Sequence, residues 1–441
     1  MGQAACGSAQ GVAHAADTAQ VDREAIVRPA GGRPGRLRYG VLVVALMVLI
    51  GLPFSATAEG SADIRYIAPN PAGSADGSDW ANAAPLKDLP DLVAELRQGG
   101  EILLRADAGP YKVGKPIVLG DRGVDTPLTI RGADPSGEGA TPLLVGGRTA
   151  PYSPISAATG RSIFTLDTGA DHLTFENLRF ENVGNGCFVL RGAVQDLMIS
   201  DVYATNVRRF IENEDNDESS VAGLAVRRTI VQGFSKDAVR LQNDTHDVLF
   251  EDVVVDSQAQ DGDLFAMGFH LTETVHDVVF LRVVAMNARD TISDYRNGDG
   301  FVAERETYGL RFEDTKAINN MDAGYDIKAS DVVFVRAIAS GNKRNFRFWG
   351  TDVWMSSSRG ADPIRRGGLG TQAQVWAGPA ARFVIEDSCF VGGDSNTIVF
   401  DLETAAVGIA ERTIIRRARG SDLRQLSDSA QMTLNGAQLK G

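Results

Sequence analysis

A short alternating pattern recurs through most of this chain and limits its possible folds more than any other feature. Eight ten-residue segments carry apolar residues at every second position, which is typical of a β-strand with one buried face. Their first residues are separated by 24, 27, 24, 30, 32, 22 and 51 positions, so the last interval leaves room for one irregular repeat. The segments are 173–182, 197–206, 224–233, 248–257, 278–287, 310–319, 332–341 and 383–392.

A second short strand pattern follows these segments, and a repeat built from short strands cannot bury its own apolar face. Stacked repeats can bury it, so the sequence predicts a solenoid. Leucine-rich repeats need a consensus that is missing here, and propeller blades are longer, at about 40 residues. We therefore predict an all-β fold, a right-handed parallel β-helix. It would form one domain over residues 59–441, with coils in 126–400 and a C-terminal cap or tail in 401–441.

Several repeats end on asparagine. Stacked amides in successive turns can bond to one another as a ladder, but asparagine is also a common turn residue without any ladder. The sequence leaves both explanations open for Asn182, Asn206, Asn287 and Asn319.

The segment 59–125 predicts an N-terminal cap. An amphipathic helix is expected at about 86–98, with one apolar stripe formed by Leu86, Leu89, Leu92, Val93 and Leu96. Such a helix would cover the open apolar end of a solenoid.

The same region carries the first family resemblance. The stretch that begins "YIAPN" at Tyr66, the motif "NAAPLKDL" and the stretch "GGEILLRADAGPY" resemble the opening of secreted pectate-lyase-like β-helix proteins. The resemblance covers most of residues 63–350 as architecture, and it implies a superfamily rather than an activity.

Residues 1–58 are interpreted as an N-terminal extension that ends in a secretory signal peptide. Three arginines precede the apolar run 40–54, which is shorter than the roughly 20 residues of a membrane-spanning helix. Small residues then lead to Ala58, where cleavage is expected; an uncleaved anchor is the alternative. The mature protein would be secreted or periplasmic, without membrane association after cleavage.

The charge balance limits the class of partner. The full chain has a net charge of −13, and residues 59–441 hold 39 basic against 54 acidic residues, or −15. Phosphate binding depends on Lys and Arg, so nucleic acid is not expected as a partner. A polyanionic substrate would need local arginines or bound cations to offset the acidic field.

The alternation of the second strands predicts which side chains point outward together. One outward column contains Arg240, His270, Val302, Asp326 and Arg347, with successive coils about 4.8 Å apart. The neighbouring column contains Gln242, Thr272, Glu304, Lys328 and Trp349. A turn just before these strands would hold Asp237, Asp299, Asp322 and Asn345.

Three of these carboxylates are expected to lie close together on adjacent coils, namely Asp299, Asp322 and Asp326. They would repel one another unless a cation lay between them, and Ca²⁺ favours several oxygen ligands in flexible geometry. The alternative is that the aspartates only satisfy their own turn backbones.

The order of these residues resembles the family-nine pectate lyases. Their "N-x-D-G-F", "N-N-x-D-D-G-W-D" and "G-N-G-F-K-L-G-G" motifs correspond here to 297–301, 319–326 and 344–350. The resemblance implies that Asp299, Asp322 and Asp326 are calcium ligands and that Arg347 stands at the position of the catalytic lysine. The chain departs from the pattern at Ala323, where the family has a carboxylate, and at Arg347 itself.

Elimination of a glycosidic bond next to a uronate carboxylate requires removal of the weakly acidic C5 proton by a base. A cation on the carboxylate stabilises the charge that develops. Arginine is an awkward base because it is effectively always charged. Some pectate-lyase-like proteins are nevertheless assigned one, so Arg347 is a candidate for base or for carboxylate clamp. Lys328 and His270 are the other candidate bases.

Other polar features have simpler interpretations. Arg240, Glu304 and Trp349 are candidate substrate-binding residues on the same face. The run 212–220 predicts an exposed acidic loop, because it lacks the glycine and final glutamate of a calcium loop. The segment 360–372 predicts a loop at the groove whose Arg365 and Arg366 could meet anionic sugar.

These observations favour an exported, monomeric lyase that cleaves an acidic, uronate-containing polysaccharide by β-elimination. A glycoside hydrolase or a C5-epimerase on the same fold is an alternative, since the first needs only paired carboxylates and the second shares the proton abstraction. A polysaccharide-binding β-helix without activity is the third possibility, and Ala323 is its main support.

Overall fold

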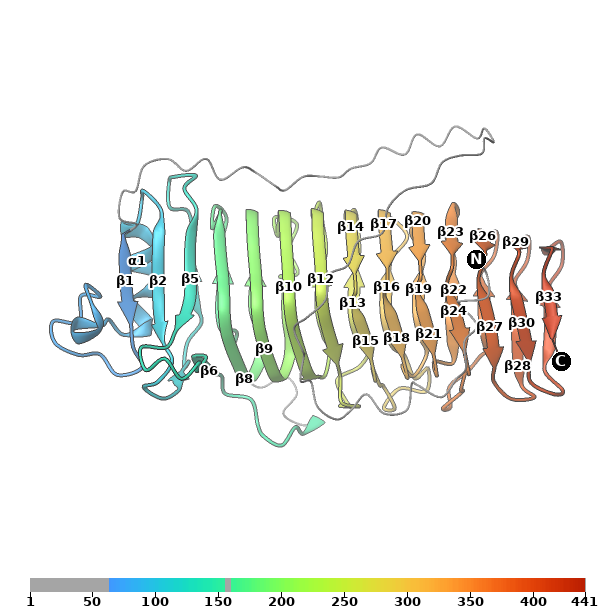
Figure 1. Ribbon diagram of the computed structural model, residues 1–441, viewed down its shortest axis with the longest axis horizontal. Helices are drawn as coiled ribbons and strands as arrows, with labels where there is room; N and C mark the ends of the chain where they lie inside the picture. Colours follow the sequence, from blue (N-terminus) through green and yellow to red (C-terminus); the bar gives the residue numbers. More distant parts are fainter. Residues whose placement is uncertain (1–62, 155–159, 441) are drawn as a thin grey trace, which may run out of the picture. The chain divides into compact units, whose positions relative to one another are not determined.

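The computed structural model describes residues 63–154 and 160–440, and β-strands dominate this part of the chain. The strands pair in parallel with their counterparts one coil away, as between Phe301 and Tyr325. Figure 1 shows successive coils side by side from β1 to β33, with α1 beside the first coils. The right-handed parallel β-helix predicted from the repeats is confirmed.

Each coil contributes strands to three faces. The first face contains β1 (Ile64–Ile67), β2 (Gly100–Arg105), β5 (Leu128–Ala133), β14 (His276–Leu281), β17 (Tyr308–Glu313), β20 (Ser330–Val335), β23 (Val353–Ser356), β26 (Arg382–Glu386), β29 (Val407–Glu411) and β32 (Gln431–Asn435). The second contains β3 (Tyr111–Lys112), β6 (Leu143–Val145), β15 (Val284–Met286), β18 (Lys316–Ile318), β21 (Ile338–Ser340), β24 (Arg359–Ala361), β27 (Cys389–Gly392), β30 (Ile414–Arg417) and β33 (Gln438–Lys440).

The third face carries the predicted outward columns, and we call it the site face. It contains β4 (Ile117–Leu119), β7 (Phe164–Leu166), β11 (Asp237–Leu241), β13 (Ala266–Leu271), β16 (Gly298–Ala303), β19 (Ala323–Ile327), β22 (Arg344–Phe348), β25 (Gln372–Ala377), β28 (Thr397–Leu402) and β31 (Asp422–Leu426). Four longer strands bend from one face to the next: β8 (Leu173–Leu190), β9 (Ala193–Asn213), β10 (Ser220–Phe234) and β12 (His246–Asp256).

The repeat units stack in the register that the alternation predicted. Val278 lies opposite Leu310, which in turn lies opposite Val332. The irregular repeat expected between 341 and 383 is β23, where Val353 lies opposite Val332 and Phe383. Pairing also continues through β33, so coils extend beyond the expected boundary at residue 400.

The interior is filled by side chains that recur once per coil. The rings of Phe301, Tyr325 and Phe346 stack in sequence, with centroids 4.9 and 5.3 Å apart. These three rings are fully buried, and contact between like aromatic rings adds to the burial of their apolar area. The repeated turn-plus-aromatic pattern is therefore explained by packing alone.

Both explanations for the asparagines apply. Asn182, Asn206, Asn287 and Asn319 all have positive φ, the conformation that asparagine tolerates in turns. Asn206 also donates to Asn182 over 2.7 Å, so those two form a ladder step. A longer buried amide ladder lies at a position that the sequence did not indicate, through Asn320, Asn342, Asn345 and Gln374.

The N-terminal helix exists but is shorter than expected. Residues Leu86–Asp88 form a 3₁₀ turn (η3), and α1 spans Leu89–Glu95; a second 3₁₀ turn, η2, spans Trp80–Asn82. Pro90 suits the first turn of α1, and Gly99, at φ +82°, follows soon after the helix ends. Leu89, Leu92 and Val93 are buried, as a cap over the first coils requires.

The predicted signal segment, residues 1–58, lies outside the described residues. None of the helices in the part that the structure describes combines the length and apolar character of a membrane-spanning segment.

Candidate active site

One outward column runs along the middle of the site face. Arg240 lies opposite His270, His270 opposite Val302, and Asp326 opposite both Val302 and Arg347. This is the column that the sequence predicted. It also extends in both directions, to Glu212 before Arg240 and to Trp376 and Asp401 after Arg347.

The neighbouring column places one predicted substrate-binding residue, Glu304, beside the predicted base Lys328. Lys328 Nζ donates to Glu304 Oε1 over 2.5 Å and lies 3.7 Å from Asp326 Oδ2. Burial opposes the charge of Lys328, but Asp326 and Glu304 outweigh it and raise the pKa of the ammonium. Lys328 is therefore protonated and tied into an ion pair, which suits a proton donor better than a base.

The turn carboxylates are arranged differently from the prediction. Asp322 does precede β19, but Asp299 and Asn345 lie inside strands β16 and β22 rather than in the turn before them. In the register of β16 and β19, Asp299 faces Ala323, whose N–H donates to Asp299 Oδ1 over 2.5 Å. Both Asp299 and Asp322 are fully buried.

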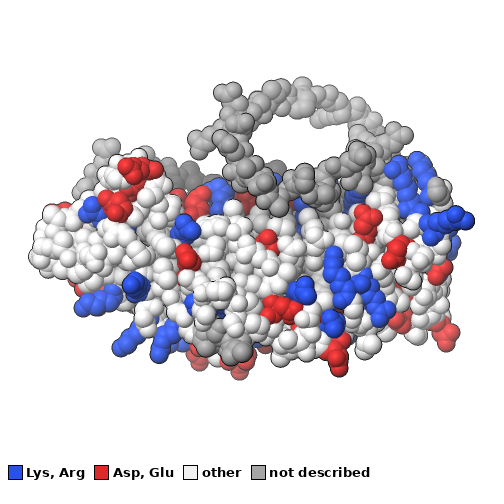
Figure 2. Space-filling model, turned by 90° about the horizontal axis from the view of Figure 1, so that it is seen from below, with Lys and Arg blue, Asp and Glu red and all other residues white. Residues whose placement is uncertain are grey.

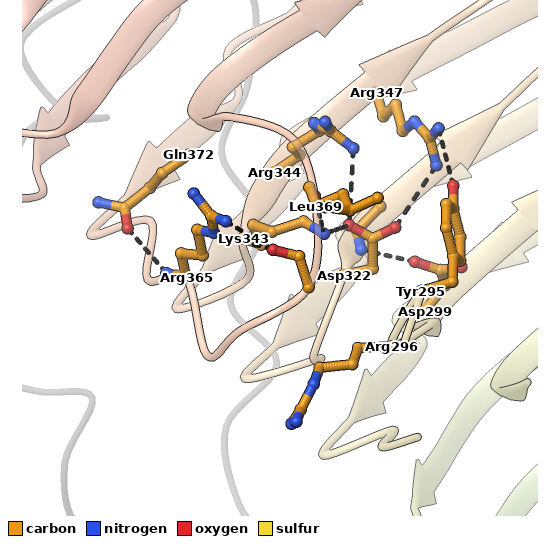
Figure 3. Close-up of polar contacts among 12 residues, drawn as sticks. Tyr295, Arg296, Asp299, Asp322, Lys343, Arg344, Arg347, Arg365, Leu369 and Gln372 are labelled. Atoms are coloured by element: carbon orange, nitrogen blue, oxygen red, sulfur yellow. Dashed lines mark hydrogen bonds and ion pairs between the residues drawn. The ribbon is translucent and has the colours of Figure 1, made fainter. Parts of the chain in front are cut away.

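Three cationic side chains surround Asp322 (Figure 3). Lys343 Nζ is 2.6 Å from Asp322 Oδ1, and Arg344 Nη1 is 3.6 Å from the same oxygen. Arg347 Nη1 is 3.6 Å from Asp322 Oδ2 and 3.3 Å from Asp326 Oδ2. The aspartates are thus close together, as predicted, but side chains supply the positive charge between them.

Burial and the neighbouring charges together shift the pKa values of Asp299 and Arg347. Burial, followed by Asp322 and Asp326, raises the pKa of Asp299 far above its usual range. Burial also opposes the charge of Arg347, but Asp326 and Asp322 outweigh it and raise its pKa. An arginine held this firmly in its charged form is a poor proton acceptor.

The aspartates do not fit the calcium ion that the family resemblance implies. Ca²⁺ takes six to eight oxygen ligands, but ammonium and guanidinium groups lie against the oxygens of Asp322 and Asp326. Asp326 Oδ1 also accepts from the Trp349 indole, over 2.8 Å, and Ala323 has no side-chain oxygen. Within residues 63–154 and 160–440, no cluster of three or more His, Cys, Asp and Glu side chains has a metal-binding arrangement.

Two tryptophans flank the charged cluster. Trp349 and Trp376 lie 4.6 Å apart at 63°, and the Arg347 guanidinium lies 4.8 and 5.1 Å from their ring centres. Trp376 is buried, whereas Trp349 is half-buried and presents part of its ring to the surface. Cation–π contact with both rings restrains the orientation of Arg347.

Two candidate functional residues, Tyr295 and Glu212, were not predicted from the sequence. Tyr295 is 45% exposed, and its hydroxyl accepts a hydrogen bond from Arg347 Nη2 over 3.3 Å. Glu212 belongs to β9 and is buried, so the start of the run 212–220 is not the exposed loop that was predicted. Tyr295 lies in an irregular loop, where no periodic pattern could indicate it. Glu212 lies among other acidic residues, so its segment was interpreted as a loop and not as the end of a strand.

His270 occupies a different electrostatic environment from Arg347. Burial lowers the pKa of the imidazole, although Asp237 and Glu304 partly oppose that shift. The ring is therefore neutral at neutral pH. Its column neighbour Arg240 is weakly paired, with Nη2 3.7 Å from the exposed carboxylate of Asp215.

An arginine-lined cavity of about 370 Å³ lies at one edge of the site face, next to Met321. Arg289, Arg296 and Arg366 line it, together with the turn amides of Asn287 and Asn319. Figure 3 shows Arg296 directed away from Asp299 and Asp322. Figure 2 shows basic side chains gathered on one part of the surface among acidic and neutral ones.

The carboxylates near this cavity neutralise only one of its arginines. Arg289 pairs with Asp261 over 2.9 Å, whereas Arg366 donates to the Gly341 carbonyl. Burial and the neighbouring Arg289 lower the pKa of Arg366. The cavity therefore has an excess of positive charge.

Comparison with known proteins identifies the fold. No protein-family profile and no curated protein sequence matches the chain. Among solved structures, the A-module of mannuronan C-5 epimerase AlgE6 from Azotobacter vinelandii is 13% identical and covers 81% of this chain and 94% of its own, with a TM-score of 0.57. The catalytic domain of a GH87 α-1,3-glucanase in complex with nigerose is 10% identical, covers 86% and 70%, and has a TM-score of 0.51.

The pectate lyase Pel9A is a further structural match, 13% identical over 79% of each chain, with a TM-score of 0.46. The chain has a parallel β-helix fold, which the resemblance of its opening motif implied. At identities this low, structural likeness shows the fold alone, and the reaction has to be argued from the site.

Proposed function

We propose that this protein is a polysaccharide lyase that cleaves an acidic, uronate-containing polymer by β-elimination. The observation that carries the proposal is the neutral imidazole of His270 beside the guanidinium of Arg240 on the site face. A neutral base next to a fixed cation is the pair that removal of a proton beside a carboxylate requires.

The roles of the site residues follow from their charge states. His270 takes the C5 proton while Arg240 binds the uronate carboxylate and stabilises the negative charge that develops on it. The electron pair of the C5–H bond forms the C4–C5 double bond as the C4–O bond breaks, and the leaving oxygen takes a proton. Lys328 is protonated and lies on the same face, so it is our candidate donor of that proton.

Arg347 has a supporting part in this scheme. Its pKa is raised and it contacts Asp322, Asp326 and two tryptophans, so it would organise the cluster instead of accepting the C5 proton. Glu304 positions Lys328 through their ion pair. The half-buried ring of Trp349 offers a surface for a sugar ring to stack on.

The arginine-lined cavity supports an acidic substrate. A chain with a net charge of −13 would repel a polyanion in general. Arg296 and Arg366 counteract that repulsion at the edge of the site face, where a carboxylate of a neighbouring sugar would be attracted.

An assay on polygalacturonate and polymannuronate, following the ultraviolet absorbance of the unsaturated product, tests the proposal. His270→Gln should lose about 10²–10⁴-fold in kcat/KM, as expected for removal of a general base. His246→Gln is the matched control, since His246 begins β12 on another face and stacks on His276; its activity should be unchanged. The wild-type rate should fall as acid protonates His270, below its usual pKa of about 6.5.

Other products would point to the alternative reactions. New reducing ends without ultraviolet absorbance would indicate a hydrolase, and solvent deuterium at C5 in an uncleaved polymer would indicate an epimerase. Full activity of His270→Gln would exclude the proposed base whichever product is formed.

A further inference from the structure

Lys343 is the most deeply buried cation of the charged cluster. Its side chain is 2% exposed, and its ammonium group lies 2.6 Å from Asp322 Oδ1. The same group donates to the Leu369 carbonyl over 3.1 Å. Lys343 therefore contacts a carboxylate of the site and the backbone of the loop between β24 and β25 at once.

The cluster contains as many cations as carboxylates. Asp299, Asp322 and Asp326 supply three carboxylates, and Lys343, Arg344 and Arg347 supply three cations within 3.6 Å of Asp322 or Asp326. Buried carboxylates need such compensation because the loss of hydration costs several kcal/mol per ion. The three cations all come from one coil, since Lys343 directly precedes β22 and Arg344 and Arg347 lie in it.

The loop that Lys343 reaches is held at several points. The Arg365 N–H donates to Gln372 Oε1 over 2.7 Å, and Arg365 Nη2 donates to the Gly368 carbonyl over 2.6 Å. Between these points Leu369 is 72% exposed, and only its carbonyl bonds inward, to Lys343. Figure 3 shows Lys343 lying between Asp322 and this loop.

We propose that Lys343 takes the place of a calcium ion in this carboxylate cluster, so that the site works without a divalent cation and its loop is fixed by a lysine. The ammonium lies against Asp322 Oδ1, an oxygen that a bound metal would need, and Ala323 lacks the carboxylate that the family resemblance implies there. The inference concerns the charge balance of the cluster and does not depend on which reaction the protein catalyses.

A gain-of-function variant tests this substitution of lysine for metal. Ala323→Asp combined with Lys343→Asn removes the ammonium and adds two oxygen donors, which should create a calcium site. Calcium at about 100 times its Kd should then raise the Tm by about 2–4 °C, and titration calorimetry should detect calcium binding. Ala323→Asp alone keeps Lys343 and is the matched control, in which calcium should have no effect.

The wild-type protein provides a test that needs no variant. Neither calcium nor EDTA should change its Tm, and a calcium-dependent rise would overturn the proposal. Calcium binding by Ala323→Asp with Lys343 in place would overturn it as well, because the ammonium would then not exclude the ion.

Limited proteolysis tests the contact between Lys343 and the Leu369 carbonyl separately. Lys343→Met should speed limited proteolysis within residues 362–371 several-fold, while Lys316→Met, which changes an exposed lysine on β18, should leave the rate unchanged. Equal cleavage rates in both variants would show that Lys343 does not fix the loop.

Discussion

The β-helix holds two sets of arginine–carboxylate pairs that differ in burial and in repetition. The first set lies in one exposed turn and recurs along the coils, each arginine bonded to an aspartate of the preceding coil. Its arginines are 46–54% exposed and all have positive φ. The pairs are Arg228–Asp201, Arg282–Asp252, Arg336–Asp314 and Arg412–Asp387.

The second set is the cluster around Asp322, which is buried and does not recur from coil to coil. Its arginine contacts, at 3.3–3.6 Å, are longer than those of the exposed pairs, at 2.6–2.9 Å. Several buried atoms in it, including Asp299 Oδ2 and Arg347 Nε, have no hydrogen-bond partner. Hydration lost by these charges is only partly replaced. The comparison teaches that repetition marks architecture, whereas a single, costly cluster marks a site kept for another reason.

Arg347→Met gives the largest expected effect. It leaves Asp322 and Asp326 buried with less compensation, and removal of one partner from a buried ion pair costs about 3–5 kcal/mol. Denaturant unfolding followed by circular dichroism would measure the loss as a lower midpoint. An unchanged midpoint would show that the cluster is already hydrated and would remove the contrast with the exposed pairs.

The same contrast explains which site residues could be predicted from the sequence. Alternation at period two places a residue outward once its neighbour is known to be buried, so Arg240, His270, Asp326 and Arg347 could be aligned correctly. The spacing of the repeats was likewise sufficient to predict that the chain forms stacked coils. These features depend on local pattern alone.

Features that depend on how the turns and loops close could not be predicted. Lys343 lies in a polar turn and would normally be exposed, yet the following coil and its loop bury it. Asp299 lies within β16 because that strand begins at Gly298, before the aspartate that was expected in the turn. The sequence also does not show which cations lie beside the three aspartates, so the contacts of Lys343 and Arg344 with Asp322 could not be predicted.

Asp299→Asn should have a smaller effect, and one that depends on pH. The folded-state pKa of Asp299 is raised by burial and by Asp322 and Asp326, whereas the unfolded value is about 3.9. The folded state therefore binds more protons above pH 3.9, and stability falls as pH rises through the folded pKa. Asparagine stays neutral and keeps the oxygen that accepts from Ala323, so the variant should gain stability relative to wild type as pH rises.

Thermal unfolding from pH 4 to pH 8 measures this difference. A variant whose deficit grew with pH would show that Asp299 is ionised and favourably paired in the folded protein.

Arg336→Met gives the smallest expected effect and is the matched partner of Arg347→Met. Asp314 and Glu313 raise the pKa of Arg336, but the side chain is 48% exposed, so solvent screens most of that interaction. Exposed pairs contribute about 0–1 kcal/mol, and salt weakens them further. The denaturation midpoint should therefore change little at low salt and not at all at high salt. A loss as large as that of Arg347→Met would mean that the exposed column stabilises the coils as strongly as the buried cluster, and that burial does not separate the two sets.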